Sequence, residues 1–214
     1  MTLELYMHPL SSYTHKVLIA LYENATQFEA KLLSDKAVAA ELKARWPVMR
    51  FPALYDRARD WFVPEASIII EYLTQHYPGH TKLIPGDLDL ARQVRLRDRF
   101  FDNYLHTPMQ KVAFDARRPQ SARDPYGINE ARELYRTALD MVEQEIDGKT
   151  WAMGDAFTMA DCAAAPALYY GDRLLLPFRK THPKSAAYLD RLMARPSYAR
   201  ALKEAEPFFH LLPK

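Results

Sequence analysis

Cysteine is almost absent from this chain of 214 residues, in which Cys162 is the only one. A single thiol can form neither an internal disulfide nor a multi-cysteine metal site, so both of these structural classes are excluded. His8, His15 and His76 stand alone in the sequence and lack the spacing of metal ligands. We therefore expect no bound metal.

An excess of charge and long apolar runs are also lacking. The chain has 29 basic and 27 acidic residues, a formal net charge of +2, and the two signs are interleaved, which predicts no nucleic-acid partner. No stretch approaches the roughly 18 apolar residues that cross a membrane, and the first residues lack the features of a secretory signal. Hydrophobic residues make up 49% of the chain, enough for a globular core. These features predict a soluble, cytoplasmic protein with no membrane partner.

Turn-forming residues divide the chain into two parts. Four of them lie close together: Pro78, Gly79, Pro85 and Gly86. They predict a linker over residues 80–86. Residues 1–79 show short apolar runs and helical spacings in the order βαβαββα, and residues 87–214 show helical spacing. The predicted fold class is α/β plus all-α, with a long helix over 87–117 in which Pro108 could introduce a bend.

Hydroxyl groups follow the first predicted strand, where the first helix begins. Ser11 and Ser12 occupy this position. Free backbone N–H groups and the helix dipole favour negative charge there, and a serine hydroxyl could donate a hydrogen bond to a bound thiolate. Serine is also a preferred helix cap. The sequence leaves both roles open.

Two further segments before the linker could contact a ligand. Phe51 and Pro52 open a predicted strand, a place where proline is tolerated. Glu65 and Ser67 lie at the start of the next predicted helix. Its N–H groups could bind a carboxylate while Glu65 accepts an ammonium, which together would recognise an amino-acid head group. The alternative is an acidic first turn that only complements the helix dipole.

A folding signal lies in the second half of the chain. Thr158 and Asp161 have the spacing of a capping box, and Phe157 and Cys162 that of the accompanying hydrophobic staple. This pattern predicts a helix start with a structural role.

These segments, in this order, resemble the cytosolic glutathione S-transferase superfamily, and the likeness spans nearly the whole chain. The matching segments are residues 8–17, 47–54, 65–73 and 157–161. The chain is similar to a serine-type, bacterial-like member. The resemblance implies a thioredoxin-like, glutathione-binding domain over residues 1–79 and a helical bundle domain over 87–214.

The resemblance also implies roles at the sulfur of glutathione, which would be the co-substrate. Ser11 would contact the sulfur, with Ser12 as the less favoured alternative and Tyr6 as a weaker one, since some members use a tyrosine of the first strand. Phe51 would pair its backbone with the cysteinyl part, next to a cis Pro52. No cysteine stands at positions 11–14, so we expect no thiol–disulfide exchange through this loop.

At the two ends of glutathione, the resemblance places Glu65, Ala66 and Ser67 at the γ-glutamyl group and Arg50 at the glycyl carboxylate. Ala66 stands where the family often has serine, which removes one hydroxyl from the carboxylate site. Met49 stands where glycine is frequent. Both departures bear on the affinity for glutathione.

The expected activity is conjugation of the glutathione thiolate to a small hydrophobic electrophile, in detoxification. Tyr13, Tyr104, Pro108 and Met109 are the candidate residues of the electrophile site. Two alternatives are kept: a glutathione-dependent isomerase, of the zeta (maleylacetoacetate isomerase) kind, or dehalogenase, and a non-catalytic binding or regulatory protein. The resemblance also implies a homodimer.

Overall fold

The computed structural model describes residues 2–213. Its first part has the predicted order βαβαββα. The elements are β1 (Leu3–Met7), α1 (Ser12–Glu23), β2 (Glu29–Leu32), α2 (Lys36–Arg45), β3 (Ala53–Asp56), β4 (Trp61–Pro64) and α3 (Ala66–His76). The strands form one sheet in the order β2-β1-β3-β4, in which β2 is parallel to β1 while β3 and β4 run antiparallel to their neighbours.

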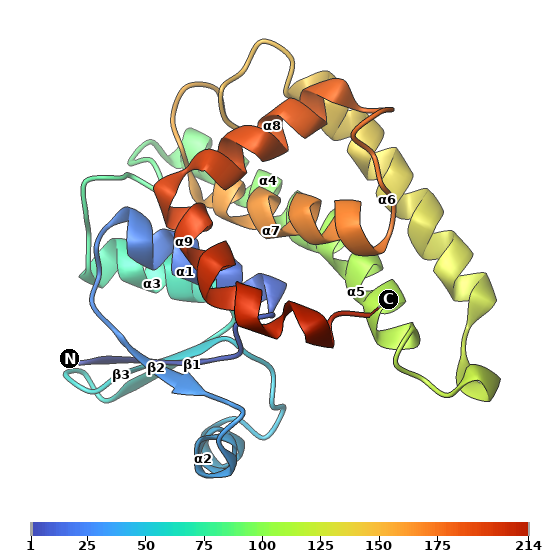
Figure 1. The fold of residues 1–214 in the computed structure, drawn as a ribbon. Coiled ribbons are helices and arrows are strands. Elements are labelled where there is room, and N and C mark those ends of the chain that lie inside the picture. Colours follow the sequence, from blue (N-terminus) through green and yellow to red (C-terminus); the bar gives the residue numbers. More distant parts are fainter. Residues whose placement is uncertain (1, 214) are drawn as a thin grey trace.

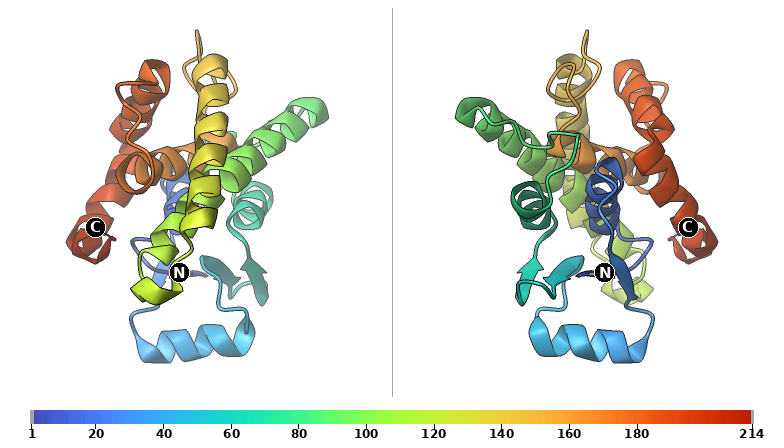
Figure 2. Two further views of the ribbon diagram at one scale, coloured as in Figure 1. Left: turned by 90° about the vertical axis from the view of Figure 1, so that its right-hand side faces the viewer. Right: turned by 90° about the vertical axis from the view of Figure 1, so that its left-hand side faces the viewer.

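Helices cover both faces of this sheet. Helices α1 and α3 lie between the sheet and the rest of the molecule, whereas α2 lies alone on the opposite face (Figures 1 and 2). All five residues of β1 are buried, because the strand is central and covered on both sides. Tyr6 points to the α2 side, where it packs with Leu42 and Ala53.

The second part is helical, as predicted. Its α-helices are α4 (Leu88–Phe100), α5 (Thr107–Asp115), α6 (Pro125–Glu145), α7 (Met159–Leu174), α8 (Pro183–Ala194) and α9 (Pro196–Ala205). Helix α7 lies at the centre of this part (Figure 1), and its residues from Met159 to Gly171 are buried. Its alanines allow α1 and α4 to pack closely against it. No helix within residues 2–213 is long and apolar enough to cross a membrane.

The predicted long helix differs from the observed one at its middle. Helices α4 and α5 are joined by a π-helical turn over Phe101–His106, in which the Thr107 N–H bonds to the Asp102 carbonyl five residues earlier. Pro108 lies in the first turn of α5. A proline inside an α-helix clashes with the preceding turn, and the wider π turn relieves this clash. The irregularity therefore begins before Pro108 instead of at it.

The predicted capping box is present at the start of α7. The Thr158 N–H donates to Asp161 Oδ2 at 2.8 Å, and both side chains are buried. The Asp161 carboxylate also accepts from the Ala152 N–H at 2.8 Å and from the Tyr188 hydroxyl at 2.6 Å. One carboxylate thus fixes the start of α7 and ties it to the preceding loop and to α8.

The two parts are joined by buried contacts of α1. Arg195, just before α9, donates two hydrogen bonds to Glu23 at the end of α1, at 2.7 and 2.6 Å. His15, also in α1, is fully buried between the rings of Tyr170 and Tyr198, and its Nε2–H donates to the Pro9 carbonyl at 2.7 Å.

Burial of His15 makes the fold sensitive to acid. Burial lowers the pKa of His15 to about 4 from its usual 6.5. The unfolded chain therefore takes up a proton below pH 6.5 that the folded chain refuses until about pH 4. We expect His15 to reduce the free energy of unfolding by about 3 kcal/mol as the pH falls across this window.

Urea unfolding of wild type and His15→Gln at pH 7, 5.5 and 4.5 measures this contribution. Glutamine keeps an N–H donor for Pro9 and does not titrate. As the pH falls, the free energy of unfolding should decrease less steeply in the variant than in wild type, by up to the slope that corresponds to about one bound proton. His106, whose pKa burial also lowers, continues to contribute in both proteins. Identical slopes would contradict the assignment.

Candidate functional site

A cavity of about 1370 Å³ opens between the two parts of the molecule. Its walls come from the β1–α1 loop, the segment before β3, the start of α3, helices α4, α5 and α7, and the C-terminal segment 211–213. Pockets for a single small ligand usually have about 300–1,000 Å³. The cavity therefore has room for two small molecules side by side.

The structure brings all the residues expected at glutathione to this cavity. They are Ser11, Ser12, Arg50, Phe51, Pro52, Glu65, Ala66 and Ser67. They come from three separate segments, each at the start of a helix or strand. No group of three or more His, Cys, Asp or Glu side chains within residues 2–213 could hold a metal ion.

Ser11 is the cap of α1. Its Oγ accepts a hydrogen bond from the Thr14 N–H at 3.2 Å, and its side chain is half-buried at the cavity wall. This bond uses an oxygen lone pair, so the hydroxyl hydrogen is left to donate. Ser12 is the first residue of α1 and is buried. The capping role and the ligand role left open by the sequence are thus compatible in Ser11.

The alternative prediction, that Tyr6 contacts the sulfur, is wrong. Its hydroxyl donates to Glu41 at 2.5 Å, on the α2 face of the sheet and away from the cavity. Strand alternation explains the difference, because Leu5 and Met7 point to the opposite face from Tyr6.

The segment before β3 exposes backbone at the cavity. The Phe51–Pro52 peptide bond is cis, as the resemblance implied. The paired part of β3 begins at Ala53, so Phe51 lies outside the sheet ladder. Met49 has φ +57°, in the left-handed region that favours glycine. Its half-buried side chain also packs against the cluster of Tyr6, Leu42 and Ala53.

The start of α3 has free backbone donors. Glu65 stands just before the helix with φ +71° and is exposed, and the helix has no side-chain cap. The N–H groups of its first turn are therefore available to an anion, next to the Glu65 carboxylate. The Ser67 hydroxyl is already used: it accepts from Lys16 Nζ at 2.8 Å and donates to Asp98 Oδ2 at 2.7 Å. Only its backbone N–H is free.

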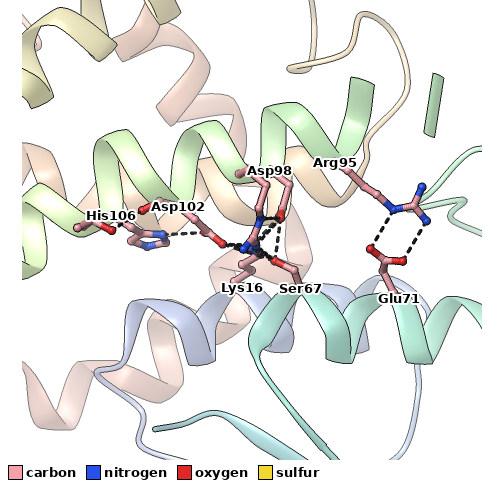
Figure 3. A network of polar contacts seen from close by, with 9 residues as sticks. Lys16, Ser67, Glu71, Arg95, Asp98, Asp102 and His106 are labelled. Carbon is pink, nitrogen blue, oxygen red and sulfur yellow. Dashed lines mark hydrogen bonds and ion pairs between the residues drawn. The ribbon is translucent and has the colours of Figure 1, made fainter. Parts of the chain in front are cut away.

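A charged network, most of which is buried, adjoins the start of α3 (Figure 3). Lys16, in α1, is fully buried, and its Nζ lies 2.7 Å from both Asp98 Oδ1 and Asp102 Oδ2 of the α4 region. Arg99 contacts the same two carboxylates at 2.7 and 2.5 Å. His106 Nδ1 lies 3.3 Å from Asp102 Oδ1. Two carboxylates thus face two basic side chains.

The network shifts the pKa of Asp102. Burial alone would raise the pKa of this carboxyl, but the Lys16 charge and the contact with His106 outweigh burial and hold the pKa well below its usual range. A second ion pair extends the line along α3 and α4, where Arg95 donates to both oxygens of Glu71 at 2.9 and 3.0 Å (Figure 3).

This network was not predicted from the sequence, although a signal was present. Lys16 falls within the apolar stripe of its helix, three residues after Tyr13 and next to Val17, where a charge must be buried. Asp98 and Asp102 are four residues apart and so share one helix face. A buried cation and two carboxylates on one helix face are complementary in charge. Only the tertiary structure shows that these three residues are paired.

The expected electrophile residues are brought together only in part. Tyr13 and Met109 line the cavity, and the Tyr13 ring lies 4.6 Å from that of His106. Tyr104 and Pro108 do not line it: Tyr104 is 46% exposed and packs against Phe100, and Pro108 is buried within its helix. The π turn inserts one residue and rotates the side chains that face the cavity. The side chains that α5 presents to the cavity instead are Thr107, Gln110, Lys111, Ala113 and Phe114. Arg117, two residues after the end of this helix, also lines the cavity.

Comparison with known proteins agrees with this architecture. The family model for the glutathione S-transferase N-terminal domain matches residues 5–81, and that for the C-terminal domain matches residues 107–196. A stringent starvation protein A homolog from Coxiella burnetii is 28% identical over 209 residues, covering 94% of this chain and 92% of that protein.

Among solved structures, a glutathione S-transferase from Methylobacterium radiotolerans in complex with glutathione sulfonate has a TM-score of 0.81 and 27% identity, and 93% of each chain is covered. A glutathione transferase from Phanerochaete chrysosporium in complex with oxidized glutathione has the same fold, with a TM-score of 0.84 and 23% identity, over 96% of this chain and 97% of that one. The four-stranded sheet with its helices and the all-helical part that follows are those of this fold. The chain therefore belongs to the cytosolic glutathione S-transferase superfamily.

Proposed function

We propose that this protein is a glutathione transferase, which binds glutathione in the cavity and conjugates its sulfur to a small electrophile. One observation carries the proposal: a single cavity brings together a hydroxyl at a helix start, an unpaired strand-like backbone and an uncapped helix start beside a carboxylate. The first group matches the sulfur of glutathione, the second its peptide backbone and the third its amino-acid end.

Ser11 would activate the sulfur. A free thiol has a pKa near 8.5, so most of it is protonated at neutral pH. A hydrogen bond from the Ser11 hydroxyl and the positive end of α1 both favour the thiolate and lower that pKa. The thiolate attacks an electrophilic carbon and forms the carbon–sulfur bond. In a substitution, the leaving group departs with its electron pair, and the proton released from the thiol goes to solvent.

The two ends of glutathione would be held by charge. The γ-glutamyl carboxylate accepts from the free N–H groups of Ala66 and Ser67, and Glu65 accepts its ammonium. Arg50, exposed at the rim, reaches the glycyl carboxylate. Alanine at position 66 lacks a hydroxyl donor, which costs about 1.5–3 kcal/mol for a bond to a charged group, while the backbone donors remain.

A non-catalytic binding or regulatory protein of the same fold is the second candidate. It is favoured by the Ser67 hydroxyl, which the buried network occupies, and by the stringent starvation protein A homolog among the relatives. An isomerase or dehalogenase would keep glutathione and change the reaction.

Calorimetry with glutathione, followed by a conjugation assay with 1-chloro-2,4-dinitrobenzene, separates the candidates. The proposal expects binding at submillimolar glutathione and turnover, with binding about tenfold weaker in Glu65→Gln and unchanged in the control Glu133→Gln, a surface residue. Binding without conjugation, together with turnover of a maleyl cis–trans substrate or release of halide, would indicate the isomerase or dehalogenase. No binding at millimolar glutathione would indicate the non-catalytic protein.

We also propose a homodimer with two-fold symmetry, which acts in the cytoplasm in detoxification. Two large apolar side chains are exposed on neighbouring helices, Ile68 on α3 and Leu96 on α4. Such residues are candidates for a subunit interface. Sedimentation equilibrium should give twice the chain mass of 24.8 kDa, and a single-chain mass at micromolar concentration would contradict the dimer.

Recovery of the native protein in the soluble cell fraction tests its proposed location in the cytoplasm.

A further inference from the structure

The part of the cavity beyond the glutathione-contacting wall is apolar with a basic edge. Helix α5 and the C-terminal segment form it, and its apolar side chains include Ala113, Phe114, Leu211 and Leu212. Two basic side chains, Lys111 and Arg117, complete this part of the wall. A purely apolar electrophile would contact the apolar side chains and leave the two basic side chains without a ligand.

Acidic residues are confined to the other end of the cavity. Those that line it are Glu65, Glu71, Asp98 and Asp102, all at α3 or the α4 region. Glu71 is paired with Arg95, and both aspartates with Lys16 and Arg99. None of the carboxylates that line the cavity within residues 2–213 therefore lies on α5 or on the C-terminal segment.

Arg117 is the cation of this region that remains unpaired. Lys111 lies 3.5 Å from Asp124, whereas within residues 2–213 no carboxylate lies within 4 Å of the Arg117 guanidinium. The guanidinium carbon of Arg117 lies 6.0 Å from the centre of the Phe114 ring. An arginine offers planar pairs of N–H donors that match a carboxylate.

His8 shows that this charge faces the β1–α1 loop. Burial and then the positive charge of Arg117 lower the pKa of His8, so its ring is neutral at pH 7. The ring packs edge-on against Phe208, and its Nδ1 accepts from the Leu10 N–H at 3.2 Å. The remaining nitrogen, Nε2, therefore carries the hydrogen and is a second donor at this wall. His8 lies three residues before Ser11, and both line the same cavity as Arg117, so the basic edge and the proposed sulfur site border one space.

We propose that the electrophile carries a carboxylate, which Arg117 binds while the apolar body of the substrate packs between α5 and the C-terminal segment. The proposal rests on the proposed function and names its second substrate class: an aromatic or unsaturated carboxylate with an electrophilic carbon. The carboxylate is unchanged in the reaction. The glutathione sulfur forms the new bond, and the leaving group, such as chloride, departs with its electron pair.

A matched pair of substrates tests this inference, namely 4-chloro-3,5-dinitrobenzoate and its methyl ester. They differ in charge at one end, and each enzymatic kcat/KM is divided by the uncatalysed rate with glutathione. Wild type should favour the carboxylate about tenfold, and the preference should shrink at high salt because an exposed charge pair is screened. Arg117→Ala should remove the preference and leave the ester within twofold. Arg118→Ala is the control, because Arg118 pairs with Asp115 and does not line the cavity.

Two outcomes would overturn the inference while leaving the proposed function intact. One is an equal decrease of kcat/KM for both substrates in Arg117→Ala. The other is a rise of the KM for glutathione, which would place Arg117 at the glycyl carboxylate. If neither substrate is turned over, the proposed function fails, and binding of the unreactive 3,5-dinitrobenzoate decides the anion site. Binding that is weakened about tenfold in Arg117→Ala supports the site, and equal binding or none rejects it.

Discussion

Replacement of Ser11 by alanine is expected to lower kcat/KM for glutathione conjugation about 10- to 100-fold. The reason is the loss of a hydrogen bond to a charged sulfur, worth about 1.5–3 kcal/mol. The same change removes the cap of α1, where Ser11 Oγ accepts from the Thr14 N–H, and costs about 1 kcal/mol of stability. Steady-state kinetics and urea unfolding of the same samples measure the two effects.

Two further variants separate chemistry from capping. Ser11→Gly keeps most of the capping stability, since glycine is nearly as good a cap, yet lacks the hydroxyl. It should therefore lose activity as alanine does. Ser12→Ala should stay within about threefold of wild type, because buried Ser12 lies one residue inside α1. In both Ser11 variants the midpoint of kcat/KM against pH should rise toward the 8.5 of a free thiol. If Ser11→Gly kept the wild-type pH midpoint and kcat/KM while Ser12→Ala lost activity, Ser12 and not Ser11 would be the residue that activates the sulfur.

Replacement of Lys16 by methionine is expected to cause the largest loss of stability, about 3–5 kcal/mol. Methionine has a similar length but no charge, so Asp98 and Asp102 lose the buried ammonium that lies 2.7 Å from each. The exposed Arg99 then compensates the two carboxylate charges only in part. Chemical denaturation at pH 7 measures the loss. The matched control is Lys184→Met, which removes an exposed pair with Asp147 and should cost less than about 1 kcal/mol.

The acid dependence of this variant is a second readout. The pKa of Asp102 is held below its usual range, so its contribution to stability is present above about pH 4 and is lost as the pH falls through lower values. Without Lys16, this acid-sensitive contribution should shrink. Adding Asp98→Asn to Lys16→Met should restore part of the stability, because one uncompensated charge is removed. A Lys16→Met protein as stable as wild type would show that the buried pairs contribute nothing.

Local signals in the sequence predicted most of the fold. The order βαβαββα follows from apolar runs and turn residues, which act over a few neighbours. The capping box of Thr158 and Asp161 was read correctly because both partners lie within one helical turn. The resemblance brought Ser11, Phe51 and Glu65 to one site, and the structure places all three at one cavity.

Features that depend on tertiary structure were not predicted. The π turn over Phe101–His106 shifted the register of the helix, and Tyr104 consequently points away from the cavity that the sequence assigned to it. Lys16 and Asp102 are 86 residues apart in sequence. Pairing across such a separation depends on how α1 packs near the α4 region, which no local pattern specifies.

A crystal structure with bound glutathione tests the central claim most directly. The account predicts an extended tripeptide along the cavity wall, with its sulfur about 3–3.5 Å from Ser11 Oγ, its backbone paired with Phe51 and its γ-glutamyl carboxylate at the first turn of α3. A cavity that stays empty at saturating glutathione, or a sulfur that lies away from Ser11, would contradict it.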